Sequence, residues 1–97
     1  MAATITEGTL KDDVSTYIIA HYLDEIKGAH EYLDMAKKAM ETNRHNLAEW
    51  LQRIAYDEYT HAKFIHEYIH ANKLPLSEDD SNKLYLLEKK MQEFPSV

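Results

Sequence analysis

Apolar residues return along this chain at alternating intervals of three and four, which is the period of an amphipathic α-helix. Three segments carry the pattern: residues 10–42, residues 47–73 and a shorter one at 78–93. Glycine and proline occur only twice each, which favours long uninterrupted helices over a sheet with many turns. The pattern therefore predicts an all-α protein in one domain of residues 1–97, with two long antiparallel helices forming a hairpin and a short C-terminal helix.

Polar residues mark the expected helix ends. Residues 1–9 are expected to be a loose lead-in, with Thr9 as the N-cap of the first helix. Asn46, with Glu49 three residues later, is expected to begin the second helix. The helix is expected to end at about Lys73, because the residue before Pro75 is pushed out of the helical conformation. Ser77 is expected to cap the third helix, whose first turn holds acidic residues that the helix dipole favours.

The first helix carries two apolar stripes. One contains Val14, Ile18, Glu25, Ala29, Tyr32, Ala36 and Ala39, and the other contains Ile19, Leu23, Ile26, Leu33 and Met40. Two stripes need two partners, and the second helix of the hairpin can cover only one of them. The simplest source of the other partner is a second copy related by a two-fold axis, so we predict a homodimer that forms a four-helix bundle.

Three polar residues fall on these predicted seams. The second helix alternates in the same way through Leu47, Leu51, Ile54, Glu58, His61, Ile65 and Tyr68. Glu25, Glu58 and His61 are therefore expected to face inward, where unpaired carboxylates are costly and raise each other's pKa. A divalent cation would offset that cost, and the i, i+3 spacing of Glu58 and His61 lets both reach one ion. Carboxylate with imidazole suits iron, manganese or zinc; the alternative is a hydrogen-bonded polar pair that fixes the helix register.

Other polar and aromatic residues near these positions have two interpretations. Tyr32 is either a core aromatic residue or a hydrogen-bond partner of a metal ligand. His21, one turn before Glu25, is either an extra or alternative ligand or, as we favour, a partly exposed histidine. We expect His30, His45, His66 and His70 on the surface, and Trp50 and Phe64 in the packing.

Composition narrows the classes of partner. The net charge of −6 would repel the phosphates of nucleic acid. The absence of cysteine excludes disulfides, thiolate metal sites and thiol catalysis. No apolar run approaches the roughly 18 residues that span a bilayer, and the first residues do not match a signal peptide. We therefore expect no nucleic-acid or membrane partner and a cytoplasmic location.

The segments "EIKGAHEY" and "AYDEYTHA" resemble the first two helices of a rubrerythrin-type domain in the ferritin-like superfamily. Ala55, Glu58, His61 and Ala62 match its A-x-x-E-x-x-H-A run. Bundles of that superfamily take one Glu from each of two helices and a Glu-x-x-His from each of the other two, and this chain supplies half of the set. Its short length, third helix and Glu25-to-Tyr32 spacing are similar to those of the encapsulated ferritins, which are half-ferritin hairpins. The resemblance covers residues 15–75.

This resemblance implies a ferroxidase that oxidises Fe²⁺ to Fe³⁺ with O₂, in iron storage or detoxification. Glu25, Glu58 and His61 would be the catalytic and metal-binding residues of a di-iron centre at a dimer interface, with manganese or zinc as alternative metals. The implied assembly is a homodimer or a ring of dimers, inside an encapsulin shell in the cytoplasm. Two alternatives remain open: a non-catalytic helical dimer stapled by a metal, and a rubrerythrin-like peroxidase.

Overall fold

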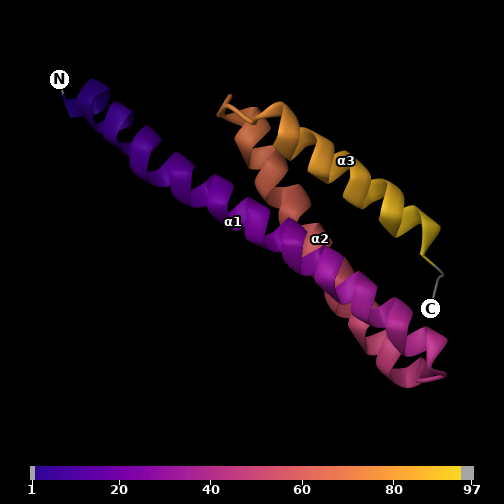
Figure 1. Ribbon diagram of the computed structural model, residues 1–97. Helices are drawn as coiled ribbons and strands as arrows, with labels where there is room; N and C mark the ends of the chain where they lie inside the picture. The colour runs from indigo at the N-terminus through magenta and orange to yellow at the C-terminus, as the bar shows by residue number, and fades with distance from the viewer. Residues whose placement is uncertain (1, 95–97) are drawn as a thin grey trace.

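The computed structural model describes residues 2–94, and the side chains of residues 14–94. Its three helices are α1 (Ala2–Glu41), α2 (His45–Ala71) and α3 (Glu78–Glu93), so the all-α prediction is confirmed. The molecule measures 61 × 20 × 16 Å, and α1 sets its length because 40 helical residues span about 60 Å. In Figure 1, α2 runs back along α1 and α3 lies alongside the hairpin. Within residues 2–94, none of these helices combines the length and the apolar character needed to cross a membrane.

The start of α1 differs from the sequence prediction. Residues 2–9 are helical, so the expected lead-in and the Thr9 cap are wrong. A cap residue such as Thr9 favours a helix start but does not impose one. The only helix breaker in this stretch is Gly8, which costs only about 1 kcal/mol relative to alanine, and extending an existing helix is far easier than nucleating one.

The turn between α1 and α2 is a Schellman motif. The Arg44 N–H donates to the Ala39 carbonyl (2.8 Å), and the Asn43 N–H donates to the Met40 carbonyl (3.0 Å). Asn43 takes the left-handed conformation that the motif requires, with φ 61°. The chain reverses so quickly that Arg44 becomes the N-cap of α2 without a side-chain cap hydrogen bond. The predicted Asn46 cap is therefore wrong, because Asn46 already lies inside the first turn.

A second Schellman motif ends α2. The Leu74 N–H donates to the Ile69 carbonyl (2.8 Å) and the Lys73 N–H donates to the His70 carbonyl (3.1 Å), with Lys73 at φ 57°. The helix thus ends at Ala71, two residues before the predicted boundary. The start of α3 is as predicted, since the Ser77 hydroxyl accepts a hydrogen bond from the Asp80 N–H (3.0 Å).

Small residues line the contact between α1 and α2. The buried apolar residues of α1 are Tyr22, Ile26, Ala29, Leu33, Ala36 and Ala39, and those of α2 are Ala48, Ala55, Ala62 and Ile69. The α2 set recurs at seven-residue intervals, which return to nearly the same helix face. Alanine leaves little side-chain bulk between the helices, so their axes can approach closely.

The third helix covers one side of this hairpin. Its predicted apolar stripe of Leu84, Leu87 and Met91 is buried in the core cluster. Polar contacts at its edge add to the packing: the Tyr59 hydroxyl donates to Glu88 Oε2 (3.2 Å), and the Lys90 ammonium pairs with Asp34 Oδ1 (3.1 Å). The apolar stripe that includes Ile26 and Leu33 is therefore covered within the single chain.

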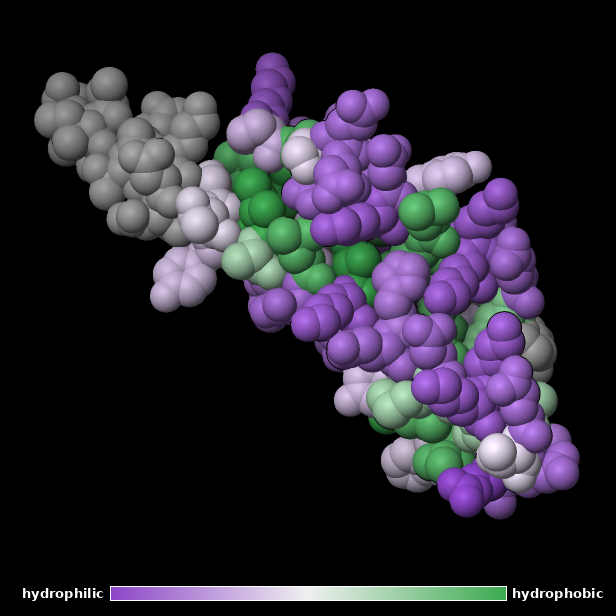
Figure 2. All heavy atoms as spheres, viewed as in Figure 1, coloured by the Kyte–Doolittle hydropathy of each residue, from purple (hydrophilic) through white to green (hydrophobic). Residues whose placement is uncertain are grey.

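The opposite side of the hairpin is uncovered, and we call it the open face. It consists of Ile18, His21, Glu25, Tyr32 and Met35 on α1 and of Leu47, Leu51, Ile54, Glu58, His61, Ile65 and Tyr68 on α2; each of these residues is exposed or half-buried. Apolar side chains are also exposed on the surface of the molecule. In Figure 2, hydrophobic residues are visible in the upper part and at the lower end of the view. The seam that we predicted on α2 is thus the open face rather than the core of one chain.

Candidate metal centre

Glu25, Glu58 and His61 meet midway along the hairpin. Glu25 comes from α1, and the other two come from adjacent turns of α2. One ligand atom of each residue lies within 4.8 Å of those of the other two. The structure therefore brings together the three residues that the sequence singled out, on two facing helices.

The three residues differ in exposure, and this corrects the expectation that they face a core. The Glu25 side chain is only 12% exposed and Glu58 is half-buried, whereas the His61 side chain is 59% exposed. The cluster thus has a protein wall behind the carboxylates and an opening on the imidazole side. An ion could enter from the open face without any rearrangement of the helices.

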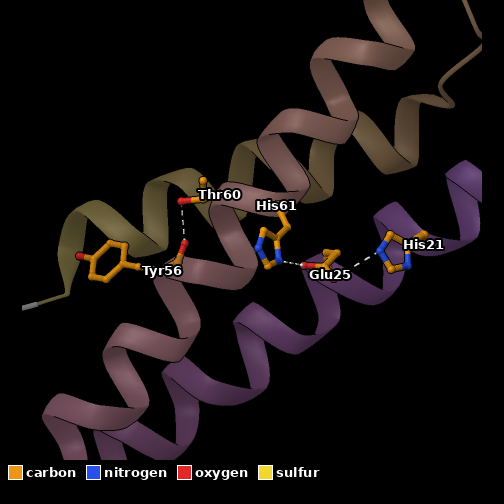
Figure 3. A network of polar contacts seen from close by, with 5 residues as sticks. All are labelled: His21, Glu25, Tyr56, Thr60 and His61. Carbon is orange, nitrogen blue, oxygen red and sulfur yellow. Dashed lines mark hydrogen bonds and ion pairs between the residues drawn. The ribbon is translucent and has the colours of Figure 1, made fainter.

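Glu25 lies between two imidazoles (Figure 3). Its Oε2 is 3.0 Å from Nδ1 of His61, and its Oε1 is 3.6 Å from Nε2 of His21. His21 is 65% exposed at its side chain, as favoured for a partly exposed histidine, yet it also touches the predicted ligand Glu25. The two interpretations of His21 are therefore compatible with each other.

The carboxylates of Glu25 and Glu58 repel each other. Burial raises the pKa of Glu58, and the negative charge of Glu25 and a hydrogen bond to it raise it further; His61 and His21 act in the opposite direction. Two carboxylates at close range resist simultaneous ionisation. A cation beside both carboxylates would favour the charged form of Glu58 and remove this conflict.

Gly28 provides the space that the Glu58 side chain occupies. A Cβ added at Gly28 would lie 3.0 Å from Oε2 and 3.4 Å from Cδ of Glu58. The absent side chain lets the carboxylate lie against α1 next to Glu25. Sequence reasoning missed Gly28, although a glycine inside a helical segment and three residues after a predicted ligand was the available signal.

Tyr32 and the other four histidines differ in how far they are buried. Tyr32 is half-buried and packs against the core cluster, which supports its interpretation as a core aromatic residue. His45 and His70 are exposed as predicted, but the surface prediction is wrong for His30 and His66, which are half-buried. The His66 ring lies 6.0 Å from that of the buried Tyr22, centroid to centroid.

Two aromatic residues of α2 that were expected in the packing lie exposed. Trp50 is 70% exposed and Phe64 is 66% exposed, so their predicted packing does not occur within one chain.

Shallow hollows flank the cluster along the open face. One is lined by Tyr17, Ile18, His21 and Ile65, and the other includes Met35, Ala39, Leu47 and Leu51. Apolar surface thus borders the polar cluster on both sides along the hairpin axis.

Comparison of the chain with models of known protein families, with curated proteins and with solved structures finds no match. The resemblance to ferritin-like proteins therefore rests on residues 15–75 of the sequence alone.

Proposed function

We propose that two copies of this chain join through their open faces and oxidise Fe²⁺ at a two-iron centre between them. The observation that carries the proposal is the cluster of Glu25, Glu58 and His61, whose ligand atoms lie within 4.8 Å of one another at the surface of the hairpin. Three ligands leave an ion incompletely held, because first-row metals usually take four to six. A second copy supplies the missing ligands.

The surroundings of the cluster support a contact between copies. Exposed aromatic and aliphatic side chains lie before and after it along α2, among them Phe64 (66% exposed) and Leu47 (46% exposed). A two-fold contact uses the same patch on both chains, so a cluster in the middle of the open face meets its own copy. The pair would hold four carboxylates and two imidazoles, which matches the ligand set of ferritin-like bundles.

The chemistry follows from this ligand set. Two Fe²⁺ ions are substrate, and together they give two electrons to O₂, which takes up two protons from solvent and leaves as H₂O₂. The four carboxylates balance the charge of two Fe²⁺ ions and stabilise the more highly charged ferric product. Gly28 keeps the Glu58 carboxylate next to Glu25, so the residues are in place before the ions bind.

An anaerobic Fe²⁺ titration of the apo protein, followed by air, tests the proposal. We expect saturation near one iron per chain and then rapid growth of near-ultraviolet absorbance. Glu58→Gln should abolish both, because it keeps the shape of the side chain but removes its charge. Glu67→Gln, on an exposed residue of the same helix, is the matched control and should behave as the parent.

The same experiment separates the alternatives. Iron-dependent dimerisation with equally slow oxidation in parent and Glu58→Gln would identify a metal that only staples two chains. Faster oxidation with peroxide than with O₂ would identify a rubrerythrin-like peroxidase. Absence of iron binding by the parent would overturn the proposal entirely.

A further inference from the structure

The Glu25 carboxylate presents its two oxygens to two different imidazoles. Oε2 is 3.0 Å from Nδ1 of His61, across the hairpin, and Oε1 is 3.6 Å from Nε2 of His21, one turn earlier on α1. Figure 3 shows the carboxylate between the two rings. Both imidazoles are mostly exposed, at 59% and 65% of their side chains, so each can be reached from the open face.

The two oxygen–nitrogen separations can be compared with those of atoms bound to one ion. Two atoms bound to one ion at about 2.1 Å lie about 3.0–3.4 Å apart, depending on the coordination angle. The separation between Oε2 and His61 falls within that range, and the separation between Oε1 and His21 exceeds it by a few tenths of an ångström. Among the residues described, His21 does not belong to the group of ligand atoms within 4.8 Å. An ion held by His21 would therefore lie at a different position from one shared by Glu58 and His61.

We propose that His21 is a fourth metal ligand of each chain, and that Glu25 bridges two ions: one at Oε2 with His61 and Glu58, the other at Oε1 with His21. This inference rests on the proposed two-iron centre. In a two-fold pair, the ion at Oε1 of one chain is the ion that Glu58 and His61 of the partner subunit hold. Each ion then receives two imidazoles, one from each chain.

The alternative is an ordinary ion pair on the helix surface. An exposed i, i+4 pair between His21 and Glu25 would contribute little to stability and nothing to metal binding. The two interpretations differ in one measurable property, the number of nitrogen ligands per ion. The visible absorption of bound Co²⁺ reports that number without any need for oxidation chemistry.

The test is an anaerobic Co²⁺ titration of the full chain with His21→Gln, Glu58→Gln and His70→Gln. His70 is an exposed histidine near the end of α2 and serves as the matched control. We expect the parent and His70→Gln to bind about one Co²⁺ per chain with the same spectrum. His21→Gln should bind at least about tenfold more weakly, since the loss of even an outer partner of a ligand costs that much, and its absorption bands should shift.

The outcomes distinguish this inference from the function on which it rests. If His21→Gln matches the parent in affinity and spectrum while Glu58→Gln does not bind, His21 is not a ligand and only this inference fails. If the parent does not bind Co²⁺, or Glu58→Gln binds as the parent does, the shared centre itself fails. Circular dichroism of each variant confirms that the helices are intact.

Discussion

Single residues carry backbone and side-chain constraints that shape both turns and the cluster. Asn43 and Lys73 occupy the left-handed region, at φ 61° and 57°, in the two Schellman motifs. Asparagine tolerates this conformation because its side chain can bond to the local backbone, whereas lysine has no such compensation. Lys73 therefore holds the turn after α2 at a conformational cost.

Replacing Lys73 with glycine should stabilise the protein. A non-glycine residue in the left-handed region costs about 1–2 kcal/mol, and part of the gain is lost to the greater freedom of glycine in the unfolded chain. We expect a net gain of about 1 kcal/mol, or several degrees in Tm. Thermal unfolding at fixed protein concentration measures it, and Asn43→Gly is the control with a smaller gain. An unchanged or lower Tm for Lys73→Gly would contradict the argument.

Replacing Gly28 with alanine should change the stability and the metal affinity of the protein in opposite directions. Alanine at this helical position gains about 1 kcal/mol in helix propensity, but its Cβ would lie 3.0 Å from Glu58 Oε2 and push the carboxylate away by a few tenths of an ångström. We expect Gly28→Ala to raise the Tm of the metal-free protein and to weaken Fe²⁺ or Co²⁺ binding. Unfolding in chelator and a metal titration measure the two effects separately.

The matched control is Ser81→Ala on α3, an exposed position remote in sequence from the cluster. It should leave metal affinity unchanged. Tighter metal binding by Gly28→Ala would show that Glu58 does not use the space beside Gly28.

At the scale of the elements, the sequence predicts the helices well and their facing sides less well. Ser77 and the stripe of Leu84 and Leu87 place α3 correctly, because cap and stripe agree. The hairpin seam was placed one position off on α2, since Leu51 and Ile54 look more like core than Ala48 and Ala55 do. The distinguishing signal is alanine at strict seven-residue spacing, which marks close helix contact.

The candidate ligands were predictable for a different reason. Glu25 falls on an apolar stripe of the first helix, and Glu58 and His61 fall on one of the second. The position of a residue relative to such a stripe depends only on its own helix. The sequence marks Gly28 only as a glycine inside a helix, because its role depends on the side-chain direction of Glu58 across the hairpin. The Asn46 cap was predicted wrongly, since "NRHN" offers two asparagines and periodicity does not choose between them.

The contact between α3 and the hairpin should respond to pH through His30. Burial lowers the pKa of His30 below its ordinary value of 6.5, and the positive charge of Lys90 lowers it further, while Asp34 opposes this. The unfolded chain therefore takes up the proton first as the pH falls. Stability that neutral His30 contributes is complete above about pH 6.5 and is lost as the pH falls through the folded-state value.

Denaturant unfolding between pH 7.5 and 5, in chelator, measures this effect. The free energy of unfolding of His30→Gln should decrease less over that range than that of the parent. His45→Gln, at an exposed position, is the control and should follow the parent. Parallel curves for parent and His30→Gln would exclude His30 as a contributor.

At the scale of the whole molecule, the proposed pairing of two copies depends on the open face. Phe64 lines a hollow together with Ile18, Ile65 and Tyr68, which belong to this face. We expect Phe64→Glu to weaken dimerisation strongly, because two charged carboxylates would enter an apolar contact. Sedimentation equilibrium with and without metal measures the shift.

Leu86→Glu places the same charge on an exposed residue of α3 (57% exposed). It should dimerise as the parent does. If both variants dimerise like the parent, copies do not meet through the open face. If only Leu86→Glu dissociates, the contact lies on α3 instead.

The position of α3 has a consequence for how far association can proceed. A two-helix hairpin without α3 would expose apolar residues on two opposite sides. A molecule that can associate through two sides can stack into an open-ended filament. Here Leu84, Leu87 and Met91 of α3 cover one side within the chain. In the proposed dimer the other side is fully occupied once two copies pair. A chain cut before Ser77 would regain the second side. It should change from a finite particle into a polymer, whose light scattering rises with concentration and time.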